Sequence, residues 1–296
     1  MASLYTHRAE NVRKTWLLMT VFFLLVIAIG FGAAYYFDTP WILYGAAGFA
    51  VSMNIVAYWN SASIALSSAR ARKVSYEELP ELHRAVENLA ITAGLPKPEV
   101  YVIDDPAPNA FATGRDPKHS AIAVTTGLLA MLDKTELEGV LAHELSHIGN
   151  RDILVMTVAV VLVGVIAVLG DIAWRMSVFG GSDNNNKNPV MIIAFIVGMI
   201  FAPIAAQLMQ LAISRKREFL ADASGALLTR YPDGLSRALA KIGGYSAPMQ
   251  HTSSATAHLF ISNPFGKSQK GNFVAKLFAT HPPVEERIAA LQSLHV

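Results

Sequence analysis

Four long stretches of the chain contain no Asp, Glu, Lys or Arg, and this restricts the folds available to it. They are residues 16–37, 41–69, 153–170 and 188–214. A helix of about 20 apolar residues is long enough to cross a bilayer. Only 16% of the residues are charged and 53% are hydrophobic, whereas about a quarter are charged in soluble globular domains. We therefore predict four transmembrane helices.

Two of these stretches admit another interpretation. Basic residues precede 16–37, as in a cleaved signal peptide, but its apolar run exceeds the roughly 7 to 15 residues of a signal core. The stretch 153–170 is rich in Val and Ile and is also compatible with a long buried helix of a protein core. In 188–214, Gln207 and Gln210 are expected to face protein or water rather than lipid.

Basic residues flanking the first two stretches predict the orientation of the chain. Three precede the first stretch and three follow the second, whereas residues 38–40 between the stretches carry no positive charge. Because basic flanks stay on the cytoplasmic side of a membrane, we expect the N-terminus and the parts outside the membrane to be cytoplasmic. The basic residues are Arg8, Arg13, Lys14, Arg70, Arg72 and Lys73.

This reading divides the chain into four parts. Residues 1–69 form an N-terminal transmembrane hairpin, and 70–150 form the first part of a cytoplasmic domain. Residues 151–213 form a second membrane hairpin, and 214–296 complete the cytoplasmic domain.

Charge and cysteine content exclude several classes of protein. The formal net charge is +2, from 24 basic and 22 acidic residues, which does not favour a nucleic acid as partner. The chain has no cysteine, so a thiolate metal site and a cysteine nucleophile are both excluded. Any metal must be bound by His, Asp or Glu.

The parts outside the membrane combine helices with a small sheet, an α+β pattern. Helical spacing of apolar residues predicts a helix over 78–93. Asp133, followed three residues later by Glu136, predicts the start of a helix that runs to Gly149. Residues 246–272 are rich in Ser, Gly, Asn and Pro, and we interpret them as a mobile loop near the site. Strands are predicted at 99–103, 110–113 and 120–125, and further helices at 215–228 and 283–294.

Residues 143–147 read His-Glu-Leu-Ser-His and lie within the predicted helix that ends at Gly149. Histidines four residues apart share one helical face, so both imidazoles of His143 and His147 can bind one zinc ion. Glu144 would then face a water at the open coordination position, take its proton and pass it to a leaving amine. Two histidines and a glutamate on an ordinary helix are the alternative, but the apolar neighbours would make them costly to bury without a joint role.

A hydrolytic zinc site needs a third protein ligand. Glu218 is the best candidate, because it opens the first helix after the second hairpin. Asp222 lies four residues later on the same face and is suited to accept the spare N–H of a ligand histidine. The alternative is a solvated mixture of charges beneath a membrane span.

Taken together, these motifs resemble the membrane-bound gluzincin peptidases, the family that includes the bacterial HtpX-type proteases and the CAAX prenyl proteases. The resemblance covers nearly the whole chain and is strongest to the HtpX type. It rests on the His-Glu-Leu-Ser-His motif with the following Gly-Asn-Arg-Asp, the Ser-Arg-x-x-Glu-x-x-x-Asp pattern of 214–222, the segment 109–114, and Thr280-His281-Pro282-Pro283 with Glu286-Arg287-Ile288.

The resemblance implies a set of roles. His143, His147 and Glu218 would bind one Zn²⁺ per chain, with Glu144 as general base and then acid. Asp222 would orient a ligand histidine. It further implies that Asn109 and the main chain of Ala110 lie on an edge strand that pairs with extended substrate, and that His281 donates a hydrogen bond to the oxyanion. His281 before two prolines is also a plausible residue for the start of a helix.

The sequence thus predicts a mainly α protein with a small sheet, four transmembrane helices and a zincin-like domain. The resemblance implies an endopeptidase of a bacterial inner membrane that removes unfolded or damaged membrane proteins on the cytoplasmic side. Two alternatives stay open: a processing peptidase with one defined substrate, and a non-catalytic membrane scaffold stabilised by zinc. Glu144 argues against the scaffold, because a structural site has no use for a base at that position.

Overall fold

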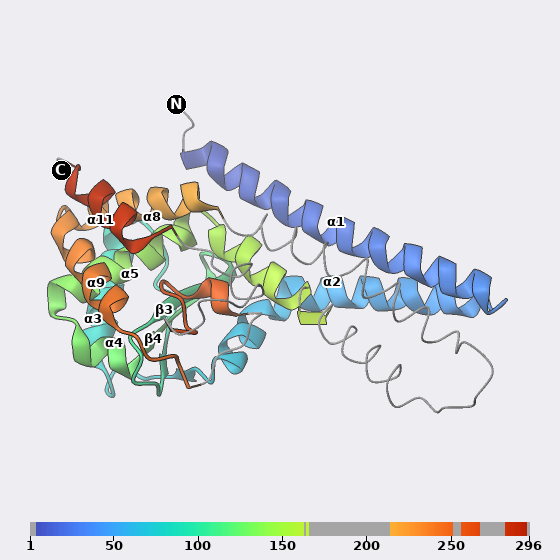
Figure 1. Ribbon diagram of the computed structural model, residues 1–296, viewed down its shortest axis with the longest axis horizontal. Coiled ribbons are helices and arrows are strands. Elements are labelled where there is room, and N and C mark those ends of the chain that lie inside the picture. Colours follow the sequence, from blue (N-terminus) through green and yellow to red (C-terminus); the bar gives the residue numbers. More distant parts are fainter. Residues whose placement is uncertain (1–3, 163, 166–213, 251–255, 267–281, 295–296) are drawn as a thin grey trace.

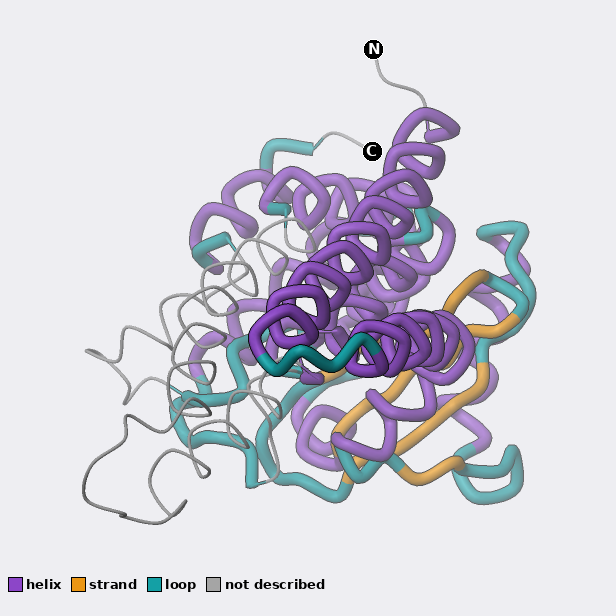
Figure 2. The backbone as a smooth tube through the Cα atoms, turned by 90° about the vertical axis from the view of Figure 1, so that its right-hand side faces the viewer, coloured by secondary structure: helices purple, strands orange, loops and turns teal. Residues whose placement is uncertain are grey.

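The computed structural model describes all residues except 1–3, 163, 166–213, 251–255, 267–281 and 295–296. Helices α1 (Leu4–Tyr36) and α2 (Trp41–Ser68) form a long hairpin that projects from a domain of shorter helices and one sheet (Figure 1). Figure 2 looks at the tip of this hairpin and shows the two helices side by side. The N-terminal end of α1 and the C-terminal end of α2 both lie at the domain.

Two of the four predicted spans are confirmed as helices that are long and apolar enough to cross a membrane, over Arg8–Tyr36 and Trp41–Ser68. The described part of the third forms a helix over Asp152–Leu162. It qualifies as a span only together with α5, to which it is bent by 81°. Its residues Leu154, Val155 and Val158 are buried in a cluster with α1 and α2. The fourth predicted span lies outside the described residues except for its last position, so four spans stays a prediction.

The sheet has four strands in the order β1-β2-β4-β3. Strand β2 (Glu99–Ile103) runs parallel to β4 (His119–Thr125), while β1 (Arg72–Lys73) and β3 (Ala110–Asp116) are antiparallel to their neighbours. The three predicted strands are confirmed, with β3 longer than expected; β1 has too few residues to show a pattern. Strand β3 is therefore an edge strand of the sheet.

Within the described part of the chain, six helices accompany the sheet: α3 (Pro80–Thr92), α4 (Thr126–Met131), α5 (Lys134–Gly149), α8 (Arg215–Thr229), α9 (Pro232–Gly244) and α11 (Val284–Gln292). Helix α5 begins as predicted: the Asp133 carboxylate accepts from the Glu136 N–H, and the Glu136 carboxylate accepts from the Asp133 N–H. Leu141, Leu145 and Ile148 of α5 are fully buried in the core that contains Ile122 and Val124 of β4. The helix is therefore fixed at its start and along its length.

A glycine of α8 lies directly against the main chain of α5. A Cβ atom at Gly225 would come within 3.0 Å of the main-chain nitrogen of His143, so any larger residue would push the two helices apart. This close approach brings the start of α8, with Glu218, beside the histidines of α5.

Part of the segment predicted as a mobile loop is instead built into the core. Residues 257–261 include a 3-10 turn, η1 (Ala257–Leu259), and all five are at most 3% exposed. The Ile261 N–H donates to the main-chain oxygen of Ala110 on β3 at 2.9 Å. The polar ends of 246–272 concealed this short apolar run, Ala-His-Leu-Phe-Ile.

Candidate metal centre and active site

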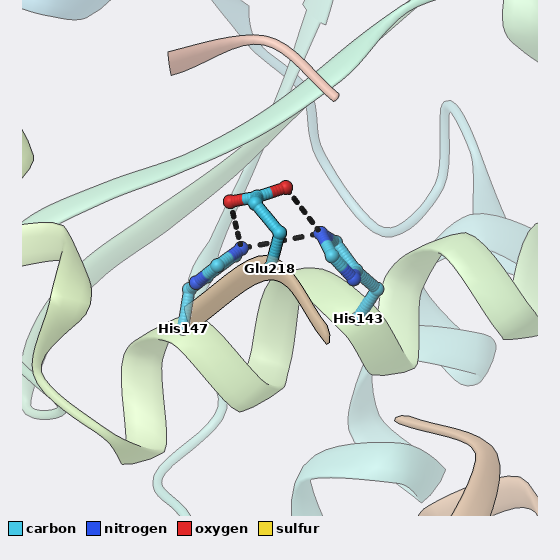
Figure 3. Close-up of side chains that lie close together, drawn as sticks. All are labelled: His143, His147 and Glu218. Carbon is cyan, nitrogen blue, oxygen red and sulfur yellow. Dashed lines mark hydrogen bonds and ion pairs between the residues drawn. The ribbon is translucent and has the colours of Figure 1, made fainter. Parts of the chain in front are cut away.

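Three buried side chains converge between helices α5 and α8 (Figure 3). His143 and His147 project from α5 towards Glu218 of α8, and their ligand atoms all lie within 4.8 Å of one another. The two Nε2 atoms are 3.1 Å apart. Glu218 Oε1 lies 3.5 Å from Nε2 of His147, and Oε2 lies 3.8 Å from Nε2 of His143.

The second ring nitrogen of each histidine is bound by a carboxylate. Nδ1 of His143 is 2.9 Å from Asp222 Oδ1, and Nδ1 of His147 is 3.0 Å from Asp152 Oδ2. In a neutral imidazole, an Nδ1–H that donates to a carboxylate leaves the lone pair on Nε2, the nitrogen that faces Glu218. Two nitrogens at 2.0–2.1 Å from a tetrahedral Zn²⁺ would be about 3.3 Å apart, close to the separation found. The residues fit a zinc ion.

Asp222 is held in turn by a buried arginine. Arg287 of α11 is fully buried and donates to Asp222 from Nε at 2.8 Å and from Nη2 at 2.7 Å. Burial works against the charge of Asp222, but the hydrogen bonds from Arg287 and His143 outweigh it and lower the pKa of the carboxyl. Burial also lowers the pKa of His143, which favours the neutral imidazole that a metal needs.

The environment of His147 raises the pKa of its imidazole, whereas that of His143 lowers it. Burial alone would lower the pKa of this imidazole, but the hydrogen bond to Asp152 and the nearby Glu218 carboxylate outweigh it and raise the pKa to about 9. In the metal-free protein at neutral pH, His147 is therefore protonated and His143 neutral.

Glu144 lies beside the cluster and is 2% exposed. Burial raises the pKa of its carboxyl to about 7, assisted by the charge of Glu218 and opposed by His147 and a hydrogen bond from the main chain of Ala112. A carboxyl with this pKa can both accept and release a proton near neutral pH.

Asn109 and Ala110 lie at the start of β3, where their polar groups are engaged by the chain itself. The Asn109 amide donates to the main-chain oxygen of Ser262 at 3.0 Å and accepts from its N–H at 3.2 Å. Together with the bond from Ile261 to Ala110, these contacts hold Ile261 and Ser262 against the start of β3. His281 lies outside the described residues.

Three residues of the site had no role assigned from the sequence. Asp152 and Arg287 belong to motifs that carried the resemblance, yet their partners are distant in the chain. Asn11 of α1 donates to Asp152 Oδ1 at 2.7 Å. Asn11 could have been noticed because it shares one face of a membrane helix with Thr15 and Leu18, four and seven residues later.

A buried His-His-Glu donor set with a further glutamate beside it is the arrangement of a metal-dependent hydrolase. The chain belongs to peptidase family M48, whose family model matches residues 77–295, and it is a membrane-associated metalloprotease. The interpretation of the sequence motifs as those of HtpX-type peptidases is confirmed.

Similar proteins cover almost the entire chain. A "Protease HtpX homolog" of Thermoanaerobacter pseudethanolicus is 50% identical over 99% of this chain and 98% of its own length. A protein of the same name from Pyrococcus furiosus is 51% identical over 83% of this chain and 84% of its own length. Among solved structures, S. mikatae Ste24p matches 97% of this chain and 67% of its own chain, with a TM-score of 0.51 and 19% identity, which shows similarity of fold.

Proposed function

We propose that this chain is an integral membrane, zinc-dependent endopeptidase in which His143, His147 and Glu218 bind one Zn²⁺. The observation that carries the proposal is the convergence of these three ligand atoms beside the buried carboxyl of Glu144. Both imidazoles have their second nitrogen bound to a carboxylate, the usual support of a metal-binding histidine.

When bound, zinc would supply a Lewis acid that activates water and polarises the scissile carbonyl. Glu144 removes a proton from the attacking water and transfers it to the leaving amine nitrogen. Its pKa of about 7 allows both transfers, because neither protonation state is strongly favoured at neutral pH. His281 as hydrogen-bond donor to the oxyanion stays a prediction.

Extended substrate would pair with the side-chain amide of Asn109 and the main-chain oxygen of Ala110 at the start of β3. Asn109 and Ala110 present the polar groups that Ile261–Ser262 now engage, and we infer that substrate replaces this segment. Pairing through main-chain atoms makes little demand on side chains. It therefore suits a protease that acts on many unfolded or damaged membrane proteins, in a quality-control role.

The hairpin α1–α2 supports a cytoplasmic location of the site. The basic residues Arg8, Arg13 and Lys14 in the N-terminal part of α1, and those that follow α2, lie at the end of the hairpin that joins the domain. The opposite turn, 38–40, has no basic residue. By the positive-inside rule the domain and its metal centre would lie on the cytoplasmic side, in a bacterial inner membrane.

The test uses the full-length protein in detergent with casein as unfolded substrate. We expect hydrolysis, its loss on chelation, and its return with one equivalent of Zn²⁺. Glu218→Ala should bind zinc far more weakly, because one of three protein ligands is gone. Glu138→Ala, at a half-buried position of α5 that is not among the ligands, is the control. Unchanged zinc stoichiometry in Glu218→Ala would contradict the ligand assignment.

A further inference from the structure

A polar side chain of the first membrane helix reaches the metal centre. Asn11 of α1 is 3% exposed, and its amide nitrogen donates to Asp152 Oδ1 at 2.7 Å and to the main-chain oxygen of Asn150 at 3.0 Å. Its amide oxygen accepts from Arg217 Nη1 at 3.2 Å. Both N–H groups and the oxygen are thus engaged, which suits a side chain that donates twice and also accepts.

The carboxylate that Asn11 contacts is the support of His147. Asp152 is 1% exposed and divides its oxygens: Oδ2 faces Nδ1 of His147 at 3.0 Å, while Oδ1 accepts from Asn11. Arg217, next to Glu218 in the chain, lies 3.6 Å from the same Oδ1. Because a buried carboxylate is oriented by its hydrogen bonds, loss of the Asn11 donor would free Asp152 to tilt away from His147.

We propose that Asn11 is a positioning residue for the metal ligand His147, acting through Asp152. The N-terminal membrane helix would then complete the metal centre as well as anchor the protein. Asn11 lies outside residues 77–295, which the family model matches. The inference rests on the proposed function, since it requires His147 to bind the metal.

A purely structural role for Asn11 makes a different prediction. In that case any buried polar residue at this end of α1 would have a similar effect when replaced. Thr15 provides the comparison: it lies one turn further along, is 1% exposed, and bonds to the main-chain oxygen of Asn11 within the same helix at 3.0 Å. Thr15→Val removes this hydroxyl without touching the Asp152 carboxylate.

The experiment measures zinc affinity of the full-length protein in detergent, by competition with a chromophoric chelator. Asn11→Asp keeps the shape of the side chain but removes its donor and places a negative charge beside Asp152. We expect it to weaken zinc binding about tenfold or more, since loss of the outer partners of metal ligands costs 10–100-fold. The visible spectrum of the Co²⁺-substituted protein should also shift, while Thr15→Val should match the unmodified protein in both.

A double-mutant cycle decides the matter if Asn11→Asp does not fold. Asn11→Ala should weaken zinc binding in the unmodified background and have no further effect in an Asp152→Asn background, because the two residues act in series. Equal effects in both backgrounds, or an Asn11→Asp variant with unchanged zinc affinity and Co²⁺ spectrum, would overturn the proposal. His147→Ala separates the two levels: if it binds zinc normally, the proposed function itself is wrong.

Discussion

The two sides of the proposed metal centre are supported by different parts of the molecule. His143 contacts Asp222 of α8, which in turn accepts a hydrogen bond from Arg287 of α11. His147 contacts Asp152, which follows α5 and accepts a hydrogen bond from Asn11 of the membrane helix α1. The first network continues to the edge of the sheet, since Arg287 Nη1 donates to the main-chain oxygen of Ile261 at 3.3 Å. One side thus leads towards the proposed substrate strand and the other towards the membrane.

The largest effect is expected from Arg287→Ala. The side chain is fully buried and neutralises Asp222, so its removal leaves a buried carboxylate without its cation. Breaking such a pair costs about 3–5 kcal/mol, to be measured by denaturant unfolding of the metal-free protein. Arg84→Ala is the control: this arginine is 57% exposed and its partner Glu81 is 79% exposed, and exposed ion pairs contribute at most about 1 kcal/mol. Equal losses in the two variants would contradict a supporting role for Arg287.

Next in size is the loss of either carboxylate. Asp222→Asn and Asp152→Asn should each weaken zinc binding by about 10–100-fold, measured at pH 9, where competition from protons is small. Asp116→Asn is the matched control, because Asp116, which is 22% exposed, pairs with His119 at 2.9 Å outside the cluster. If only one of the two variants loses affinity, the symmetric account of the two histidines is wrong.

A smaller effect, the pH dependence of zinc affinity, distinguishes the His147 side of the site from the His143 side. The pKa of His147 is raised to about 9, whereas that of His143 is lowered, so zinc must displace a proton from His147. Because one proton is released, affinity should rise close to tenfold between pH 7 and 8. Asp152→Asn removes the charge that raises this pKa and should flatten the dependence, whereas Asp222→Asn should not. A flat profile in the unmodified protein would contradict the protonated state of His147.

The smallest effect concerns the strand edge. Ser262→Pro removes the N–H that donates to the Asn109 amide oxygen, and one such hydrogen bond contributes about 0.5–1.5 kcal/mol. If substrate replaces Ile261–Ser262, weakening this segment should lower the KM for an extended peptide two- to tenfold by the same relation. Ser262→Ala retains the N–H and should leave KM unchanged. A higher KM in Ser262→Pro would mean that the segment helps to bind substrate.

The sequence was most informative where the relevant residues are close in the chain. The spacing of His143, Glu144 and His147 on one helix, and of Glu218 and Asp222 on another, follows from helical geometry. The capping residues of α5 and three of the four described strands were predicted for the same reason. These features depend on local backbone geometry alone.

Apart from Asp222, the outer supports of the site depend on tertiary packing and were not predicted. Asn11 and Asp152 are separated by 141 positions, and Asp222 and Arg287 by 65. A single sequence contains no periodicity that links them. The segment 257–261 was missed for another reason, since its apolar run is shorter than the window in which helical or strand spacing can be recognised.

The central claim is that Glu144 transfers the proton at a site where His143, His147 and Glu218 bind zinc. Glu144→Gln keeps the size of the side chain but cannot accept a proton, and general acid–base catalysis contributes roughly 10²–10⁴-fold to rate. We predict one zinc per chain in this variant and a fall in kcat of about that size, measured with casein or an extended peptide. Turnover at the unmodified rate, or loss of the zinc, would contradict the account.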